Sequence, residues 1–245
     1  MAENSKIEWT TRTFNPWIGC QKVLPGCDYC YAEALMDKRY HKVEWGPHGA
    51  RKRTSEANWK LPRRWAKQAN GTRPRVFCAS LADVFDNQVP SQWRSDLFDL
   101  IAATPELDWL LLTKRPENLR RMFPTGEWSN IWLGTTCEDQ PHYLKRYPLI
   151  ADARVAVRFI SYEPAIGPLA INLAVPAVRA PDWIICGGES GAGARMMEPW
   201  WARNLRDNCE KFGIAFFMKQ MAGKTPIPDD LMVRQFPLSK MKAAT

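Results

Sequence analysis

Short apolar runs recur along the chain from about residue 75 onward, and polar or amphipathic stretches separate them. The runs are rich in β-branched and aromatic residues and are bounded by turn-forming residues, which is typical of buried strands. We therefore expect strands at Arg75–Ala79, Trp109–Thr113, Ile131–Thr135, Val155–Ile160, Trp183–Cys186 and Ile214–Met218. Amphipathic helices are expected between some of them, at Gln92–Ala103 and Met197–Phe212.

The N-terminal part follows a related plan. Ile7–Thr10 is expected to form a short strand or an ordered arm, and helices are expected at Tyr31–Tyr40 and at about Ser55–Lys67. Strands that alternate with helices predict a parallel β/α architecture. Six or seven strands are fewer than a closed eight-stranded barrel needs. The pattern thus predicts an α/β fold, a partial (β/α)6-7 TIM-like barrel. We expect one domain over residues 1–245, with a basic insertion at about 37–75.

Polar or small residues follow each expected strand. In parallel β/α folds, ligands bind at the carboxyl ends of the strands, so these positions are candidates for a site. The candidates in the first half are Ser80 and Asp83, which could contact a cofactor or cap a helix, and Lys114 and Arg115, which could hold a carboxylate or phosphate. Those in the second half are Glu163, which could hold a ribose hydroxyl or pair with Arg158, the turn Gly187-Gly188-Glu189, the anion-binding candidate Arg195, and Lys219.

Hydropathy and charge narrow the classes of partner. No apolar run is long enough to cross a membrane, and the first nine residues are too polar for a secretory signal, so a cytoplasmic protein is expected. The net charge is +8, and residues 37–75 hold twelve Lys or Arg but only three acidic residues. Trp45, Trp59 and Trp65 are interleaved with these cations. This segment predicts a nucleic-acid partner such as DNA, or else a solvated insertion whose Trp side chains pack into the body.

Cys20, Cys27 and Cys30 are the strongest chemical signal. Their spacing is C-x6-C-x2-C, and Pro25-Gly26 forms a turn between the first two. Four interpretations are open: a disulfide with one free thiol, a structural zinc site, three unrelated core cysteines, or an iron–sulfur cluster with one iron left open. No second Cys-x-x-Cys or His cluster offers an evident fourth ligand. The remaining cysteines are expected to be buried as small apolar residues: Cys78, Cys137, Cys186 and Cys209.

Several motifs carry a resemblance to known families. The chain resembles a family of phage and prophage proteins (DUF5131-type) over residues 6–221, through Gly19-Cys20, Pro25-Gly26-Cys27, Cys30-Tyr31-Ala32-Glu33, Thr54–Trp59, Leu112–Pro116, Gly187–Gly191 and Phe216–Gln220. Its cysteine loop, with Tyr29 before the last cysteine, is similar in plan to that of the radical S-adenosylmethionine (SAM) superfamily. The usual spacing there is C-x3-C-x2-C, so the first gap is wider here. The superfamily's Gly-Gly-Glu element also follows the second strand, whereas this one is late.

The superfamily resemblance implies two cofactors, a [4Fe-4S] cluster and S-adenosylmethionine, which together generate a 5′-deoxyadenosyl radical. It implies that Cys20, Cys27 and Cys30 bind iron and that Tyr29 packs beside the cofactor. The cofactor-binding candidates are then completed by Ser80, Asp83, Gly187, Gly188, Glu189 and Arg195. The catalytic candidates are Glu189, Lys114 and Glu163.

The first functional hypothesis is a radical SAM-like iron–sulfur enzyme that acts on a nucleic-acid base or nucleotide, in modification or lesion repair. It would bind DNA through the 37–75 segment, and it would need an electron donor but no membrane. The alternative is a zinc-containing nucleic-acid-binding protein without catalysis. A third is a β/α hydrolase or transferase with structural thiols. Iron and sulfide content separates the first hypothesis from the other two.

Overall fold

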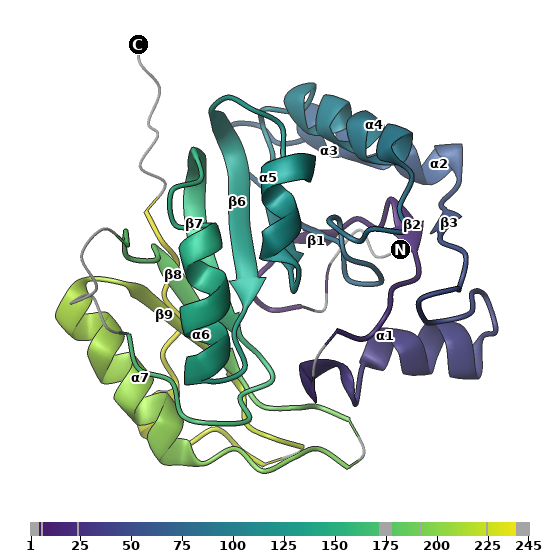
Figure 1. The fold of residues 1–245 in the computed structure, drawn as a ribbon. Helices are drawn as coiled ribbons and strands as arrows, with labels where there is room; N and C mark the ends of the chain where they lie inside the picture. Colours follow the sequence, from purple (N-terminus) through teal and green to yellow (C-terminus); the bar gives the residue numbers. More distant parts are fainter. Residues whose placement is uncertain are drawn as a thin grey trace. The chain divides into compact units, whose positions relative to one another are not determined.

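Strands and helices alternate along the chain, as the hydrophobic pattern predicts (Figure 1). The computed structural model describes residues 5, 7–23, 25–171, 178–191, 193–223 and 225–238. Within the described residues, seven strands form one sheet in the order β1-β4-β5-β6-β7-β8-β9. The pairs β1–β4, β4–β5, β7–β8 and β8–β9 are parallel. The predicted fold class, an α/β partial TIM-like barrel, is confirmed.

The chain divides into two compact units, Met1–Trp132 and Leu133–Thr245, and β6 (Trp128–Thr136) runs through the boundary. The N-terminal unit holds β1 (Arg12–Thr13), β4 (Arg75–Cys78) and β5 (Asp108–Thr113), together with the antiparallel pair β2 (Trp17–Ile18) and β3 (Lys52–Arg53). Its helices are α1 (Tyr31–Glu33), α2 (Glu56–Trp59), α3 (Leu61–Lys67), α4 (Ser91–Ala102) and α5 (Leu119–Met122). A π-helix at Ala34–Arg39 and a 3-10 helix at Pro116–Asn118 complete it.

The C-terminal unit contains β7 (Val155–Tyr162), β8 (Trp183–Gly187) and β9 (Ala215–Gln220), with α6 (Gln140–Arg146) and α7 (Pro199–Phe212). Sequence signals set the helix ends. The Asp139 carboxylate accepts the His142 N–H at 2.9 Å and caps α6. Pro199 opens α7, and Gly213 closes it in the left-handed conformation at φ 64°.

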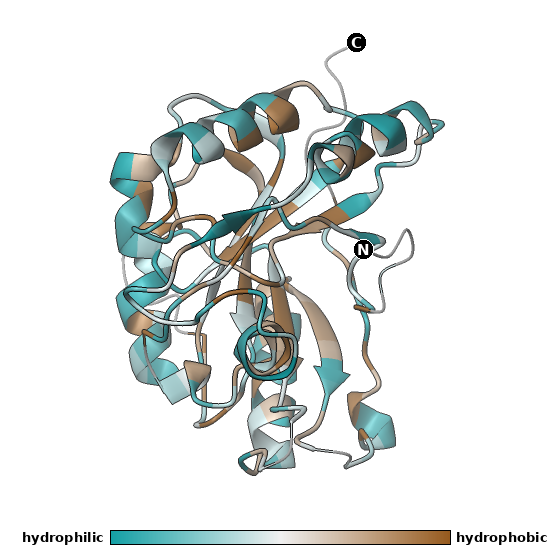
Figure 2. Ribbon diagram, turned by 90° about the vertical axis from the view of Figure 1, so that its right-hand side faces the viewer, coloured by the Kyte–Doolittle hydropathy of each residue, from teal (hydrophilic) through white to brown (hydrophobic). Residues whose placement is uncertain are grey.

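The strands form the apolar centre and the helices carry mixed faces (Figure 2). Every residue of β7 and β8 is buried, as expected for parallel strands that are covered on both faces. Trp109 and Trp183 are fully buried on β5 and β8. The remaining cysteines, Cys78, Cys137, Cys186 and Cys209, are also fully buried, which confirms their prediction as core residues.

Three local predictions hold only in part. Ile7–Thr10 is not a strand but an arm with a turn, in which Trp9 is buried and the Thr10 hydroxyl donates to Arg75 O at 2.7 Å; the first strand comes later, at Arg12–Thr13. The helix expected at Tyr31–Tyr40 is only one α-turn, followed by the π-helix, in which the Tyr40 N–H donates to Leu35 O at 3.1 Å. The helix expected at Ser55–Lys67 is broken at Lys60, because Pro62 has no N–H to donate and restricts the residue before it.

The prediction of one domain with a basic insertion is not decided by this division and stays a prediction. No helix in the described ranges combines the length and apolar character that a membrane crossing requires.

Candidate functional site

The cysteine loop follows β2 and is joined to the residues after β4. Gly19 forms a parallel bridge with Ala82, and its N–H donates to Leu81 O at 3.1 Å. Gly19 has φ +113°, and a Cβ there would lie 3.1 Å from the Arg51 side chain, so glycine suits the position. Cys20 is thereby held beside the carboxyl end of β4. Leu24, inside the same loop, lies outside the described residues.

Arg115 connects Cys20 to the end of β5. Its Nη1 donates to Cys20 Sγ at 3.5 Å, and its Nη2 donates to Gln21 O at 2.9 Å. Burial raises the pKa of the Cys20 thiol to about 11, although the Arg115 charge opposes that change. Burial lowers the pKa of Arg115, but the Asp83 charge and the Cys20 thiolate outweigh it and raise that pKa overall. Arg115 therefore stays charged next to a cysteine sulfur.

Asp83 is the anchor of this arrangement. Its carboxylate accepts Arg115 Nη1 at 3.0 Å, the Thr113 hydroxyl at 2.8 and 3.0 Å, and the backbone N–H groups of Lys114 at 3.1 Å and Phe85 at 2.9 Å. Both side chains of the Asp83–Arg115 pair are almost fully buried. The carboxylate that the sequence offers as a cofactor contact thus fixes the ends of β4 and β5 to each other.

Cys30 stands at the N-cap position of α1. Burial raises the pKa of the Cys30 thiol, and the charge of neighbouring Cys27 acts in the same direction. The backbone N–H groups of Glu33 and Ala32 and the charge of Lys114 lower it. Lys114, predicted as catalytic, therefore lies near enough to influence a predicted iron ligand. Tyr29 is about half exposed, at 51%.

Ser80 links the start of α1 to the sheet. The Tyr31 hydroxyl donates to Ser80 O at 2.6 Å, and the Asn15 side-chain amide donates to the Ser80 hydroxyl at 3.1 Å. Asn15 Oδ1 also accepts the Leu81 N–H at 2.8 Å. Both ends of the cysteine loop, Cys20 and the Cys30–Tyr31 step, are therefore held against residues 80–83.

The donor set suits an iron–sulfur cluster, because three thiols on one loop are the ligands that such clusters take from proteins. Cys20, Cys27 and Cys30 are free thiols and only partly exposed. Over the part of the chain that the structure describes, no three or more His, Cys, Asp or Glu side chains are gathered so that they could hold a metal ion. The chemistry of the residues fits the cluster, and their ligand geometry stays a prediction.

In the C-terminal unit, the predicted residues gather after β7, β8 and β9. Glu189 is buried, and its carboxylate accepts the Arg195 N–H at 2.8 Å and Arg195 Nε at 3.1 Å, with a further contact to Nη2. Burial raises the pKa of Glu189, but the hydrogen bonds and charge of Arg195 outweigh it and lower the pKa overall. Two residues predicted separately as cofactor contacts are therefore bonded to each other.

Glu163 and Lys219 form an ion pair between the ends of β7 and β9. Gly187 lies beside them, since a Cβ there would meet the Glu163 and Gln220 side chains at 3.5 Å. Gly188 packs on backbone, and a Cβ there would lie 2.5 Å from Ala222 N. The alternative predicted for Glu163, a pair with Arg158, is wrong, because Arg158 pairs with Asp182.

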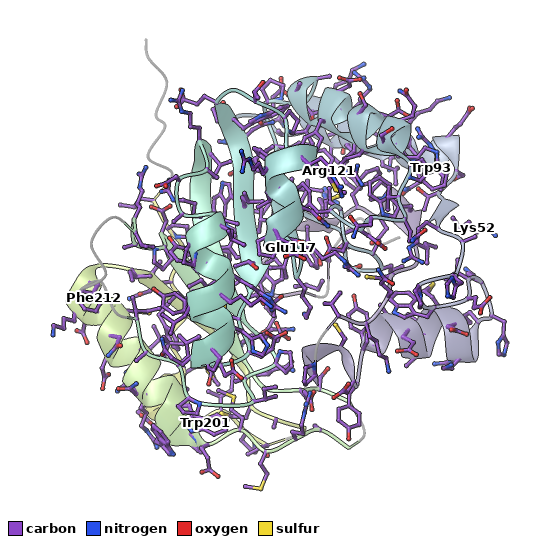
Figure 3. The ribbon with its side chains drawn as sticks, viewed as in Figure 1. Lys52, Trp93, Glu117, Arg121, Trp201 and Phe212 are labelled. Carbon is purple, nitrogen blue, oxygen red and sulfur yellow. The ribbon has the colours of Figure 1, made fainter. Side chains whose placement is uncertain are left out.

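Much of the basic segment is built into the N-terminal unit. Arg51 is buried in an ion pair with Asp86 at 2.7 Å, a contact that no local sequence pattern predicts. Arg53 pairs with Asp96 at 2.6 Å and covers the Trp59 ring at 4.1 Å. Trp65 is fully buried, whereas Lys52 on β3 is exposed (Figure 3). The second interpretation of this segment, in which its Trp side chains pack into the body, therefore holds for Trp65. The Trp59 ring is covered by the Arg53 guanidinium.

Fold and loop together define the class: a partial β/α barrel with three thiols on the loop after β2. The chain belongs to the family described as "Protein of unknown function (DUF5131)", whose model matches residues 4–236. The predicted resemblance to that family is confirmed. No curated protein matches the chain in sequence.

Solved structures of spore photoproduct lyase share the fold. One, a mutant with bound AdoMet and dinucleoside spore photoproduct, is 11% identical with a TM-score of 0.51, over 98% of this chain and 64% of that one. A second mutant is 12% identical with a TM-score of 0.50, over 89% and 59% of the two chains. A complex with dinucleoside spore photoproduct is 11% identical with a TM-score of 0.50, over 85% and 63%. The chain thus spans less than two thirds of these neighbours.

Proposed function

We propose that the protein is a radical SAM enzyme that acts on a base or nucleotide of a nucleic acid, in modification or lesion repair. The observation that carries the proposal is the cysteine loop, whose three thiols lie on the loop after β2 of a partial barrel, with Cys20 held beside the end of β4. The same fold in spore photoproduct lyase, recorded with AdoMet and a dinucleoside lesion, supports the cofactor and the substrate class.

In this proposal, Cys20, Cys27 and Cys30 hold a [4Fe-4S] cluster, and Tyr29 packs beside S-adenosylmethionine. When bound, these groups supply the one-electron chemistry, for which a protein or small-molecule electron donor is required. Arg115 keeps a positive charge against Cys20 Sγ, and Asp83 fixes that guanidinium in place. Asp83 thus acts through Arg115, and Ser80 acts by holding the start of α1.

The remaining candidates are charged groups at strand ends. Lys114 places its ammonium group near Cys30, where it can attract a carboxylate or a phosphate. Glu163 and Lys219 can exchange their mutual contact for polar groups of a substrate. Glu189 orients Arg195, and the bare Gly187-Gly188 turn allows close approach of a ligand to the backbone.

The test is anaerobic purification followed by iron and sulfide analysis and an absorption spectrum. We expect a brown protein that loses its colour in air, and a variant with Cys20, Cys27 and Cys30 all changed to Ala that contains no iron. Reductant and S-adenosylmethionine should then yield 5′-deoxyadenosine with the unchanged protein alone. A colourless preparation with stoichiometric zinc would instead favour the alternative, a zinc-containing nucleic-acid-binding protein without catalysis.

A further inference from the structure

Four cations line the exposed side of α3, between Lys60 and Lys67. Lys60 precedes the helix, and its spacing to the other three is i, i+3, i+4 and i+7, which places all four on one face. They are all exposed, whereas Pro62 and Trp65 on the other face are buried. We call the four residues the α3 stripe: Lys60, Arg63, Arg64 and Lys67.

Three members of the α3 stripe differ in their partners from the arginines of the same segment that are built into the unit. Arg51, Arg53 and Arg73 form ion pairs with Asp86, Asp96 and Asp108. Lys60, Arg63 and Lys67 form none with any residue that the structure describes. Like charges three or four residues apart on a helix repel each other and destabilise it. An anionic partner that contacts several of them at once removes that repulsion.

The surroundings of the α3 stripe favour phosphates over unstacked bases. Trp65, at the centre of α3, is fully buried. Trp59 has the Arg53 guanidinium over its ring at 4.1 Å and Phe14 against it edge-on, with ring centroids 5.6 Å apart. Neither ring therefore offers the open platform on which proteins stack the bases of single strands.

A pocket of about 290 Å³ adjoins Lys60 and Arg63, but it does not suit a phosphate. Its lining mixes both signs of charge: Asp96 is paired there with Arg53 at 2.6 Å, and Glu56 adds a second carboxylate beside Lys60 and Arg63, which weakens the attraction for an anion inside it. The outer face of α3 carries cations alone. An anionic chain is therefore expected to lie along the helix rather than to enter the pocket.

We propose that the α3 stripe binds the phosphodiester backbone of duplex DNA. From Lys60 to Lys67 the helix rises about 10 Å, which matches the rise of roughly three base pairs. This inference rests on the proposed function for the choice of nucleic acid as partner, and it localises the contact to one helix face. The contact neutralises phosphates without reading bases, so it positions the duplex without selecting a sequence.

The test uses a triple variant, Lys60→Gln, Arg63→Gln and Lys67→Gln, in the full chain. Its matched control is Lys145→Gln, Arg154→Gln and Lys211→Gln, three exposed cations of the C-terminal unit that give the same change in net charge. Binding to a fluorescent 20-base-pair duplex is measured by anisotropy between 50 and 200 mM salt. We expect the stripe variant to reduce the slope of log affinity against log salt by about 2 to 3, at roughly 0.9 per phosphate contact. The control variant should show the same slope as the unchanged protein.

Equal slopes for the two triple variants would overturn the inference, since binding would then follow net charge alone. Tight binding of anionic phosphatidylserine vesicles through the stripe, with duplex binding unchanged, would overturn it in favour of a membrane surface. Iron content and 5′-deoxyadenosine formation are measured on the same preparations. If the protein contains no iron but the stripe variant still reduces the slope of log affinity against log salt, the DNA-binding surface is supported and the proposed radical SAM function is refuted. If the protein forms 5′-deoxyadenosine but the stripe variant leaves the slope unaltered, the proposed function is supported and the DNA-binding surface is refuted.

Discussion

The Asp83–Arg115 pair gives the most specific prediction about the N-terminal unit. Changing Asp83→Asn removes the counter-charge of a guanidinium whose side chain is only 3% exposed. The Asn side chain also has an NH₂ group where Asp83 has only acceptor oxygens. This group would face the Thr113 hydroxyl and the backbone N–H groups of Lys114 and Phe85, which all donate to Asp83. Breaking a buried pair in this way costs about 3 to 5 kcal/mol, so we expect a loss of that size in the free energy of unfolding.

The assay is urea unfolding of the metal-free protein, followed by tryptophan fluorescence and circular dichroism. The double variant Asp83→Asn with Arg115→Met should lose less stability than the sum of the two single variants, because no unpaired charge is then left buried. Asp230→Asn, which removes the partner of the exposed Arg203, is the control and should change the unfolding midpoint little.

The reasoning would be refuted by an Asp83→Asn protein that unfolds like the unchanged protein. If that protein also bound S-adenosylmethionine more weakly, Asp83 would contact the cofactor, as the sequence alone suggests, and would not be an anchor. A stability loss that is fully additive in the double variant would show that the two side chains do not depend on each other.

Three further predictions follow from burial and backbone packing. Gly188→Ala should destabilise the C-terminal unit and lower the melting temperature, because the Cβ would lie 2.5 Å from Ala222 N. The control Gly191→Ala should be tolerated, because a Cβ there has no atom within 4 Å. Equal melting temperatures for the two variants would contradict this prediction. Burial raises the pKa of Cys209 from 9.0 to about 12. The contribution of this thiol to the free energy of unfolding, measured with urea, should therefore be fully present below pH 9 and be lost between pH 9 and pH 12, at no more than about 1.4 kcal/mol per pH unit. In Cys209→Ala the decrease over this range should be shallower. In the metal-free protein at pH 8, Cys20, with a pKa of about 11, should react with iodoacetamide roughly a hundredfold more slowly than an ordinary thiol, and mass spectrometry that finds equal rates would exclude its burial.

The strands of the fold could be predicted from the sequence because each is a local apolar run that the core requires. Val155–Ile160 and Trp183–Cys186 were expected at nearly the observed limits. Pro62 also indicates the break at Lys60, but the helical periodicity on both sides of it favours one continuous helix. Helix formers at Tyr31–Tyr40 gave no sign of a π-helix, because its wider hydrogen bonds depend on packing.

The candidate site was predicted less completely, because its contacts join residues far apart in the sequence. Polar strand ends identified Asp83 and Arg115 separately, but periodicity does not reveal that these two side chains, 32 positions apart, form a buried pair. Glu189 and Arg195 were likewise named as independent ligands, and they bond to each other. Charge counting treated Arg51 as one more cation of a basic surface, although it is buried against Asp86.

The two anchored ends of the cysteine loop bear on its unusual spacing. Cys20 is fixed through Arg115 and the Gly19–Ala82 bridge, and Cys30 is fixed through the start of α1, where Tyr31 reaches Ser80. The nine residues between Cys20 and Cys30 therefore connect two fixed points. Widening the first gap from three to six residues lengthens this connection from six intervening residues to nine, which adds only about 0.4 kcal/mol of closure entropy. A lineage can lengthen this gap at small thermodynamic cost, whereas moving either end would require rebuilding residues 80–83.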